Sequence, residues 1–252
     1  MSKGPAALRL DRLLSNLGYG SRREVQNLIE AGYVTLDGEA IIDGDEKVAV
    51  TADLSSRMLV EGEPLDPPAG LVLMMNKPLG VTCSHKEQGP LVYSLLPERW
   101  RARNPAISTI GRLDKESSGL LLLTDDGALL HRIISPKAVI GKRYDVTLDR
   151  PLRGDEGAVF ASGTLMLDDE DKPLLPAQFE ALSDKRALVT ITEGRYHQVR
   201  RMFAAVGNHV TALKRDRIGA LALPDDLAPG QYRVLGEAEL AQVFSSPGWS
   251  EA

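Results

Sequence analysis

The 252-residue chain has one cysteine, four histidines, 5% aromatic residues and no long hydrophobic run. Cys83 has no partner for an intrachain disulfide, and no Cys/His group has the spacing of a zinc site. No apolar stretch approaches the ~20 residues that span a bilayer, and residues 1–10 lack the apolar core and cleavage site of a signal peptide. We therefore expect a cytoplasmic, metal-free protein.

Cofactor-binding motifs are missing as well. There is no P-loop, no G-x-G-x-x-G and no set of metal ligands, so no cofactor is expected. A hydrophobic fraction of 43% with 26% charged residues is typical of a globular protein. The length allows two domains, one small and one of ordinary size.

Charge is distributed unevenly along the chain, although the net charge is only -5. Residues 1–35 hold five basic and three acidic side chains, whereas residues 36–66 hold two basic and nine acidic ones. Residues 195–217 contain six Lys/Arg and a single acid, Asp216. Local basic patches, more than the overall sum, attract a polyanion such as RNA.

The N-terminal segment predicts two helices followed by strands. Leucines at 10, 13, 14 and 17 repeat at i, i+3, i+4 and i+7, which indicates an amphipathic helix ending at Gly18. Ser21 and Glu24 have the spacing of a capping box and open a second helix, which Gly32 ends. Residues 33–36 then predict a strand leading into an Asp-Gly turn. We expect a small domain over residues 1–62.

A proline-rich segment and a larger domain follow. Residues 63–70 contain three prolines and a glycine, which favours a semi-rigid linker. Residues 71–244 are predicted to form the second domain, with strands at 71–75, 142–148 and 187–192 and a helix over 196–206. Residues 245–252 are expected to be a loose tail. The predicted fold class is α+β.

The most informative stretch is residues 111–127. Asp114 lies in a polar segment between Gly111 and Gly119, directly before the apolar run 120–123, which predicts a buried strand. A loop that leads into a rigid buried element is where catalytic groups are often held. The sequence alone also allows Asp114 to be an ordinary carboxylate in a surface turn.

This stretch closely resembles the central motif of the pseudouridine synthases that modify ribosomal RNA, with Asp114 at the position of the catalytic aspartate. Residues 193–203 resemble the second motif of that family, in which Arg200 would pair with the aspartate. Tyr144 matches the tyrosine that stacks on the target base, and Leu213 matches an apolar wall of the base pocket. The resemblance implies a catalytic domain with a mixed, mainly antiparallel sheet flanked by helices.

Residues 1–60 resemble the ribosomal S-four type RNA-binding domain. Together the two resemblances imply a ribosomal RNA substrate, most similar to that of the bacterial small-subunit (16S) branch, bound as RNA or as an assembly intermediate by a monomeric enzyme. The candidate RNA contacts are Arg9, Arg12, Arg22, Arg23, Arg112, Lys142, Arg195, Arg201, Lys214 and Arg215.

Three alternatives stay open at this point. The chain could modify 23S RNA, or it could be a non-catalytic RNA-binding or ribosome-assembly factor with the same fold. It could also be a carboxylate hydrolase, which would need a metal or a second acid, such as Glu116 or Asp125, to activate water. The presence of Asp114, Tyr144 and Arg200 together favours the synthase.

Overall fold

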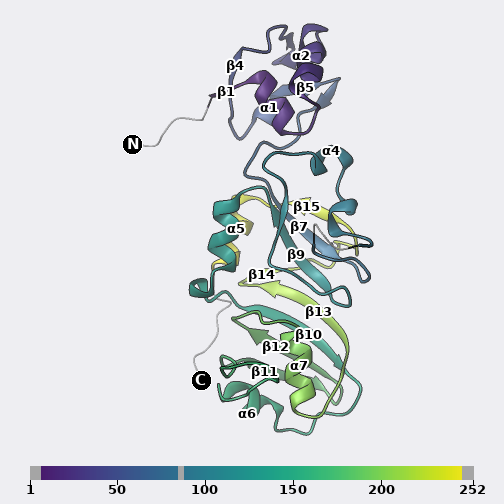
Figure 1. Ribbon diagram of the computed structural model, residues 1–252, viewed down its shortest axis with the longest axis vertical. Helices are drawn as coiled ribbons and strands as arrows, with labels where there is room; N and C mark the ends of the chain where they lie inside the picture. Colours follow the sequence, from purple (N-terminus) through teal and green to yellow (C-terminus); the bar gives the residue numbers. More distant parts are fainter. Residues whose placement is uncertain (1–6, 85–87, 246–252) are drawn as a thin grey trace. The chain divides into compact units, whose positions relative to one another are not determined.

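A computed structural model describes residues 7–84 and 88–245, and the predicted tail at 246–252 lies outside this part. The chain forms two compact units (Figure 1). The N-terminal unit comprises Met1–Leu71, Leu96–Ser108 and Thr124–Asp126, and the C-terminal unit comprises Val72–Leu95, Thr109–Leu123 and Gly127–Ala252. Two segments from the middle of the sequence therefore join the N-terminal unit.

The N-terminal unit contains two small sheets and short helices. Strand β1 pairs antiparallel with β4, and a four-stranded antiparallel sheet has the order β3-β2-β5-β6. The elements are β1 Ala7–Arg9, α1 Leu10–Asn16, α2 Arg22–Glu30, β2 Val34–Leu36, β3 Glu39–Ala40, β4 Lys47–Ala49, α3 Leu54–Arg57, β5 Met58–Val60, β6 Glu63–Pro64 and α4 Glu98–Arg101.

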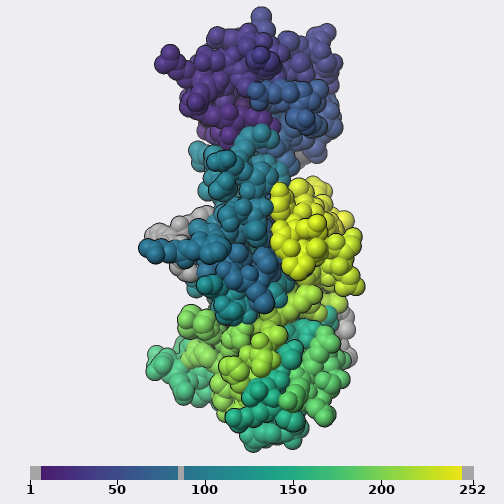
Figure 2. Space-filling view, turned by 90° about the vertical axis from the view of Figure 1, so that its right-hand side faces the viewer, coloured from purple at the N-terminus to yellow at the C-terminus, as the bar shows by residue number. Residues whose placement is uncertain are grey.

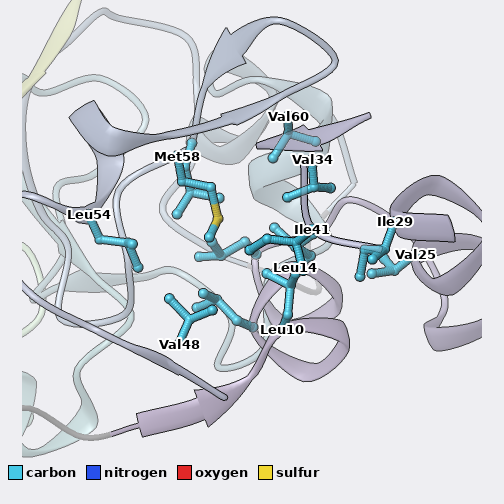
Figure 3. Packing of buried hydrophobic residues seen from close by; sticks show 13 residues of the cluster. Leu10, Leu14, Val25, Ile29, Val34, Ile41, Val48, Leu54, Met58 and Val60 are labelled. Atoms are coloured by element: carbon cyan, nitrogen blue, oxygen red, sulfur yellow. The ribbon is translucent and has the colours of Figure 1, made fainter. Parts of the chain in front are cut away.

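The two predicted N-terminal helices are confirmed. The leucine face of α1 is buried, and Ser21 caps α2 by accepting from the Glu24 amide while the Glu24 carboxylate accepts from the Ser21 amide. Figure 3 shows Leu10 and Leu14 of α1 gathered with Met58 of β5 in one hydrophobic core. Burial of this apolar face stabilises helices that are too short to be stable alone.

The proline-rich segment 63–70 is more ordered than the predicted linker. Glu63–Pro64 forms β6, and Leu65 is buried in the N-terminal core. Asp66 is also buried and accepts two hydrogen bonds from Arg99, at 2.6 and 3.1 Å. The segment is thus part of the N-terminal unit.

Residues 96–108 pack on the end of α1 and on the turn that follows it. The Arg99 guanidinium lies 4.4 Å from the centre of the Tyr19 ring, and the Asn104 amide donates to the Asn16 carbonyl. A Cβ at Gly18, which has a φ of +91°, would lie 2.2 Å from the Arg99 carbonyl oxygen, so this approach requires glycine. In Figure 2 the blue-green residues near 100 lie against the purple N-terminal ones.

The C-terminal unit is built on a nine-stranded sheet with the order β11-β12-β10-β13-β9-β7-β15, in which β14 also pairs with β13 and β8 with β9. Strands β13 and β9 are parallel, whereas β10 pairs antiparallel with both β12 and β13. The strands are β7 Val72–Lys77, β8 Ser108–Ile110, β9 Ser118–Thr124, β10 Lys142–Leu148, β11 Gln178–Ser183, β12 Arg186–Ile191, β13 Val210–Ile218, β14 Leu221–Ala222 and β15 Tyr232–Val234. The predicted α+β class with a mixed, mainly antiparallel sheet is confirmed.

Short helices accompany this sheet. They are η1 Val92–Leu95, α5 Gly127–Ile134, η2 Pro136–Ala138, α6 Glu156–Ala161, α7 Gln198–Ala205 and α8 Glu237–Val243. Phe160 of α6 makes edge-to-face contacts with Phe179 of β11 and Phe203 of α7, which joins both helices to the sheet. Among the described residues, no helix has the length and apolarity needed to cross a membrane.

Candidate active site

Asp114 lies on the loop between β8 and β9, as predicted. Its carboxylate is about one-third exposed (34%), and its carbonyl accepts a hydrogen bond from the Ser117 amide across a tight turn. The Gly80 amide donates to the Lys115 carbonyl and ties the same loop to the turn after β7. The loop therefore presents the carboxylate to solvent from a fixed backbone.

A buried lysine, which the sequence analysis missed, holds this loop. Lys77 ends β7 and is fully buried, and its Nζ donates to the carbonyl oxygens of Pro78 at 3.0 Å, Asp114 at 3.0 Å and Ser117 at 2.7 Å. Burial lowers the pKa of Lys77, and nearby negative groups oppose that shift. In the sequence, a lysine at the end of an apolar strand could have revealed this role. A buried ammonium needs hydrogen-bond acceptors for all its donors, so such a lysine is expected to bind backbone carbonyls nearby.

Gly119 allows the Asp114 loop to enter the sheet. It has a φ of +103°, and a Cβ at this position would lie 2.2 Å from the Arg215 carbonyl oxygen on β13. The parallel pairing of Ser118 with Lys214 and of Gly119 with Arg215 depends on this close approach. A side chain at 119 would push β9 away from β13 and displace the loop.

Tyr144 and Leu213 lie on the same face of neighbouring strands. In the antiparallel register Tyr144 is opposite Arg215, and Val146 is opposite Leu213. Both candidate pocket residues are mostly buried, at 8% and 5% exposure. Alternation along each strand places Tyr144, Val146, Leu213 and Arg215 on one side of the sheet.

Arg200 connects α7 with the Asp114 loop through backbone contacts. Its guanidinium donates to the Val210 carbonyl at 3.0 Å and to the Glu116 carbonyl at 2.6 Å. The expected ion pair between Arg200 and Asp114 is not among the ion pairs of the described residues. The group beside the carboxylate is His197, whose Nε2 lies 3.4 Å from Asp114 Oδ1. In this conformation Arg200 fixes the loop two residues away from the aspartate.

Several basic residues expected to contact RNA have partners within the protein. Arg9 pairs with Asp11 and Asp45, and Arg195 and Arg201 both pair with Glu170. Arg215 differs most from its expected role, because it is 2% exposed and its Nε donates to the Leu120 carbonyl at 2.8 Å. It therefore lies inside the fold and away from an RNA backbone. The exposed candidates are the paired Arg9 together with Arg12, Arg22, Arg23, Arg112 and Lys214.

Lys142 is a partly buried candidate at the start of β10. Its Nζ donates to the Ile140 carbonyl at 3.2 Å. Burial, followed by the positive charge of Arg215, lowers the pKa of Lys142 to about 8. Its amine therefore changes charge close to neutral pH.

A pocket of about 670 Å³ adjoins the Asp114 loop. Glu116 of the loop and Ser118 at the start of β9 line it together with Arg200, Leu213 and Lys214. The volume lies within the range of small-ligand sites. Within the described part of the chain, no group of three or more His, Cys, Asp or Glu side chains is arranged to hold a metal ion.

Asp125, the second acid considered for a hydrolase, is buried and paired. Its carboxylate accepts from Arg103 at 2.7 Å and from the Gly70 amide at 2.8 Å, and both side chains of the ion pair are 1% exposed. A carboxylate held in this way is not available to activate water. Asp125 therefore does not serve as the second acid that a hydrolase would need.

The family models match both parts of the chain. The model described as RNA pseudouridylate synthase matches residues 71–205, which include Asp114, Tyr144 and Arg200. The chain belongs to the RNA pseudouridylate synthase family. The S4 domain model matches residues 8–52, so the synthase carries an N-terminal S4 domain.

Similar proteins cover nearly the whole synthase. The ribosomal small subunit pseudouridine synthase A of Yersinia pestis is 42% identical over 94% of this chain and 98% of its own length. The protein of the same name from Escherichia coli strain K12 is 40% identical over 94% of this chain and 100% of its own length. A crystal structure of a pseudouridylate synthase superposes with a TM-score of 0.66 at 36% identity, covering 94% of this chain and 99% of the other.

Proposed function

We propose that this synthase converts one uridine of small-subunit (16S) ribosomal RNA to pseudouridine, with Asp114 as the catalytic carboxylate. The observation that carries the proposal is the full-length similarity, at 40–42% identity, to relatives named for the ribosomal small subunit. The enzyme would act in the cytoplasm as a monomer, on the RNA itself or on an assembly intermediate.

The reaction needs little more than the groups described above. The bond from C1′ of the ribose to N1 of uracil breaks, the base turns, and C1′ bonds to C5, whose proton is released while N1 gains one. No electrons are gained or lost overall, so neither an oxidant nor an energy source is consumed. A carboxylate can attack the anomeric carbon, attack the base or remove a sugar proton. Each of these three routes requires one carboxylate, and we propose Asp114 as that carboxylate.

The other site residues would hold the base. Stacking on the Tyr144 ring would retain the uracil face, and Leu213 would form an apolar wall beside it. A stacked uridine in a helix is out of reach, so the enzyme must extrude its target at a cost of a few kcal/mol. Arg200 would keep the Asp114 loop in place through the Glu116 carbonyl.

Pseudouridine mapping tests the target. We expect ribosomal RNA from cells lacking this protein to have lost one pseudouridine in the small-subunit RNA, and the purified enzyme to restore it. Loss of a large-subunit pseudouridine would instead assign the enzyme to 23S RNA. An unchanged map, with ribosome assembly impaired, would favour the non-catalytic assembly factor.

RNA affinity should depend on the charge of Lys142. Its ammonium is charged below a pKa of about 8 and neutral above it, so a phosphate contact would be lost as the pH rises through that value. We expect the affinity to fall roughly five- to tenfold between about pH 7 and pH 9. Lys142→Arg should remove most of this fall, because arginine remains charged.

Binding titrations of both proteins at constant ionic strength check this prediction. Exposed Lys214 offers a matched control. Lys214→Arg should leave the pH dependence of the wild-type protein in place. If the RNA affinities of wild type and Lys142→Arg change with pH in the same way, Lys142 does not contact the RNA.

A further inference from the structure

The loop before α7 exposes an aromatic ring beside the catalytic carboxylate. Tyr196 is 71% exposed, the highest fraction among the large hydrophobic side chains of the described residues. One exposed apolar residue needs no explanation by itself. The surroundings of Tyr196, however, distinguish it from the other exposed hydrophobic residues.

His197 lies between the Tyr196 ring and Asp114 and contacts both. The tyrosine ring stacks on His197 with the ring centres 3.9 Å apart and the planes inclined by 16°. His197 Nε2 in turn lies 3.4 Å from Asp114 Oδ1. One face of the tyrosine is thus covered by the imidazole, and its exposure leaves the other face open to solvent.

The backbone around Tyr196 is held rigidly although the side chain is exposed. The buried Gln198 accepts from the Arg195 amide at 2.9 Å and donates to the Glu193 carboxylate at 3.0 Å. Arg201 donates to the Tyr196 carbonyl at 3.2 Å. His197, at the N-cap of α7, has a φ of +49°, which a non-glycine residue adopts only when its surroundings impose it.

Arg195 adds a second set of restraints to this loop. Its guanidinium donates to the carbonyl oxygens of Lys172 and Pro173 at 2.7 and 2.6 Å and pairs with Glu170 and Glu193 at 3.1 Å. The backbone that carries the ring is therefore already ordered before a ligand arrives. Preorganisation of this kind raises affinity because less order must be created on binding.

The surroundings fit a nucleobase. A flat, open aromatic face binds any base by stacking, whereas the exposed cations Arg112 and Lys115 on either side of Asp114 suit the phosphates that accompany it. Tyr144, on β10, is the residue assigned to the target uracil itself. The Tyr196 ring is therefore a second aromatic surface at the site, available to another base.

We propose that Tyr196, supported by His197, is a stacking platform for an RNA base that neighbours the target uridine. The inference rests on the proposed function, because the occupant is a base of the same RNA. Stacking there would hold the strand in its opened form after the target base leaves the helix, and so favour the extruded state over the paired one.

Affinity for a single-stranded oligouridine of about ten nucleotides tests the platform without requiring turnover. We expect Tyr196→Leu, which keeps apolar area but no aromatic face, to weaken binding about 5- to 100-fold, and Tyr196→Phe to bind as the wild type does. Leu182→Ala, at a 43% exposed position on β11, is the control and should have no effect. The midpoint of thermal unfolding should be the same in all of these proteins, because Tyr196 and Leu182 are both exposed.

A 2-aminopurine scan locates the base. The fluorescent base is placed in turn at each position that flanks the target in an RNA that the wild-type enzyme converts, and stacking on Tyr196 should quench it at one position in wild type but not in Tyr196→Leu. Equal oligouridine affinities for wild type and Tyr196→Leu, within twofold, would overturn the platform even if pseudouridine forms normally. Tyr196-dependent binding without any pseudouridine would instead keep the platform and reject the proposed function.

Discussion

Asp114→Asn is expected to reduce the single-turnover rate of pseudouridine formation by roughly a thousandfold or more, within the range attributed to a positioned acid or base. The substitution keeps the size and polarity of the side chain but removes its charge and basicity. The hydrogen bonds that hold the loop use the Asp114 carbonyl, which accepts from Lys77 and from the Ser117 amide. Folding and RNA affinity should therefore stay close to wild type.

Glu116→Gln is the matched control for this experiment. Glu116 is an exposed carboxylate on the same loop, and its contact with Arg200 is made by its carbonyl oxygen. We expect turnover to change less than threefold, roughly the effect of an exposed surface substitution. If the single-turnover rate of Asp114→Asn stays within tenfold of the wild-type rate, a residue other than Asp114 is the catalytic one.

Arg103→Met is expected to destabilise the protein by about 3–5 kcal/mol, the usual cost of leaving one member of a buried ion pair alone. Arg103 and Asp125 are both 1% exposed at their side chains and lie 2.7 Å apart. Arg103 also donates to the Pro67 carbonyl at 2.9 Å. Methionine is shorter than arginine, so it would fill part of the space and leave the Asp125 carboxylate bonded to the Gly70 amide.

Urea unfolding of Arg103→Met and Arg101→Met checks this prediction. Arg101 is the last residue of the short helix α4, two positions before Arg103, but its side chain is 44% exposed and its guanidinium lies 4.0 Å from Glu98, so its loss should cost less than about 0.5 kcal/mol. Equal unfolding midpoints for the two variants would contradict a stabilising role for the Arg103–Asp125 pair. A selective effect would show that segments 96–108 and 124–126 stabilise the N-terminal unit.

The same contacts change how the protein should be divided. We propose domains at 1–62 and 71–244, and the two family models match residues 8–52 and 71–205. Residues 96–108, however, contact the N-terminal segment: the Asn104 amide donates to the Asn16 carbonyl, and the Arg99 guanidinium lies over the Tyr19 ring. A truncation that removes residues 1–66 would strip these partners from residues 96–108, so we propose that an isolated catalytic domain requires redesign of this segment.

Local structure could be predicted from the sequence where neighbouring residues decide it. The leucine spacing of α1, the capping box of α2 and the alternation along β10 each depend on residues within a few positions of one another. The Asp114 loop before β9 was predicted for the same reason, because a glycine, a short polar segment and an apolar run are contiguous. Motif spacing likewise identified the family.

Tertiary structure alone decided which charges are free. Arg195 and Arg201 share Glu170, which lies more than twenty positions away in the sequence, and Arg215 is buried against the Leu120 carbonyl of a parallel strand. Lys77 likewise contacts the Asp114 loop across a gap of 37 residues. A sequence pattern shows that a side chain is basic, but its partner depends on which distant segment the fold brings within about 3 Å. For this synthase, short-range patterns determined the elements and the Asp114 loop, and long-range packing determined which cations are held inside the protein and which are exposed.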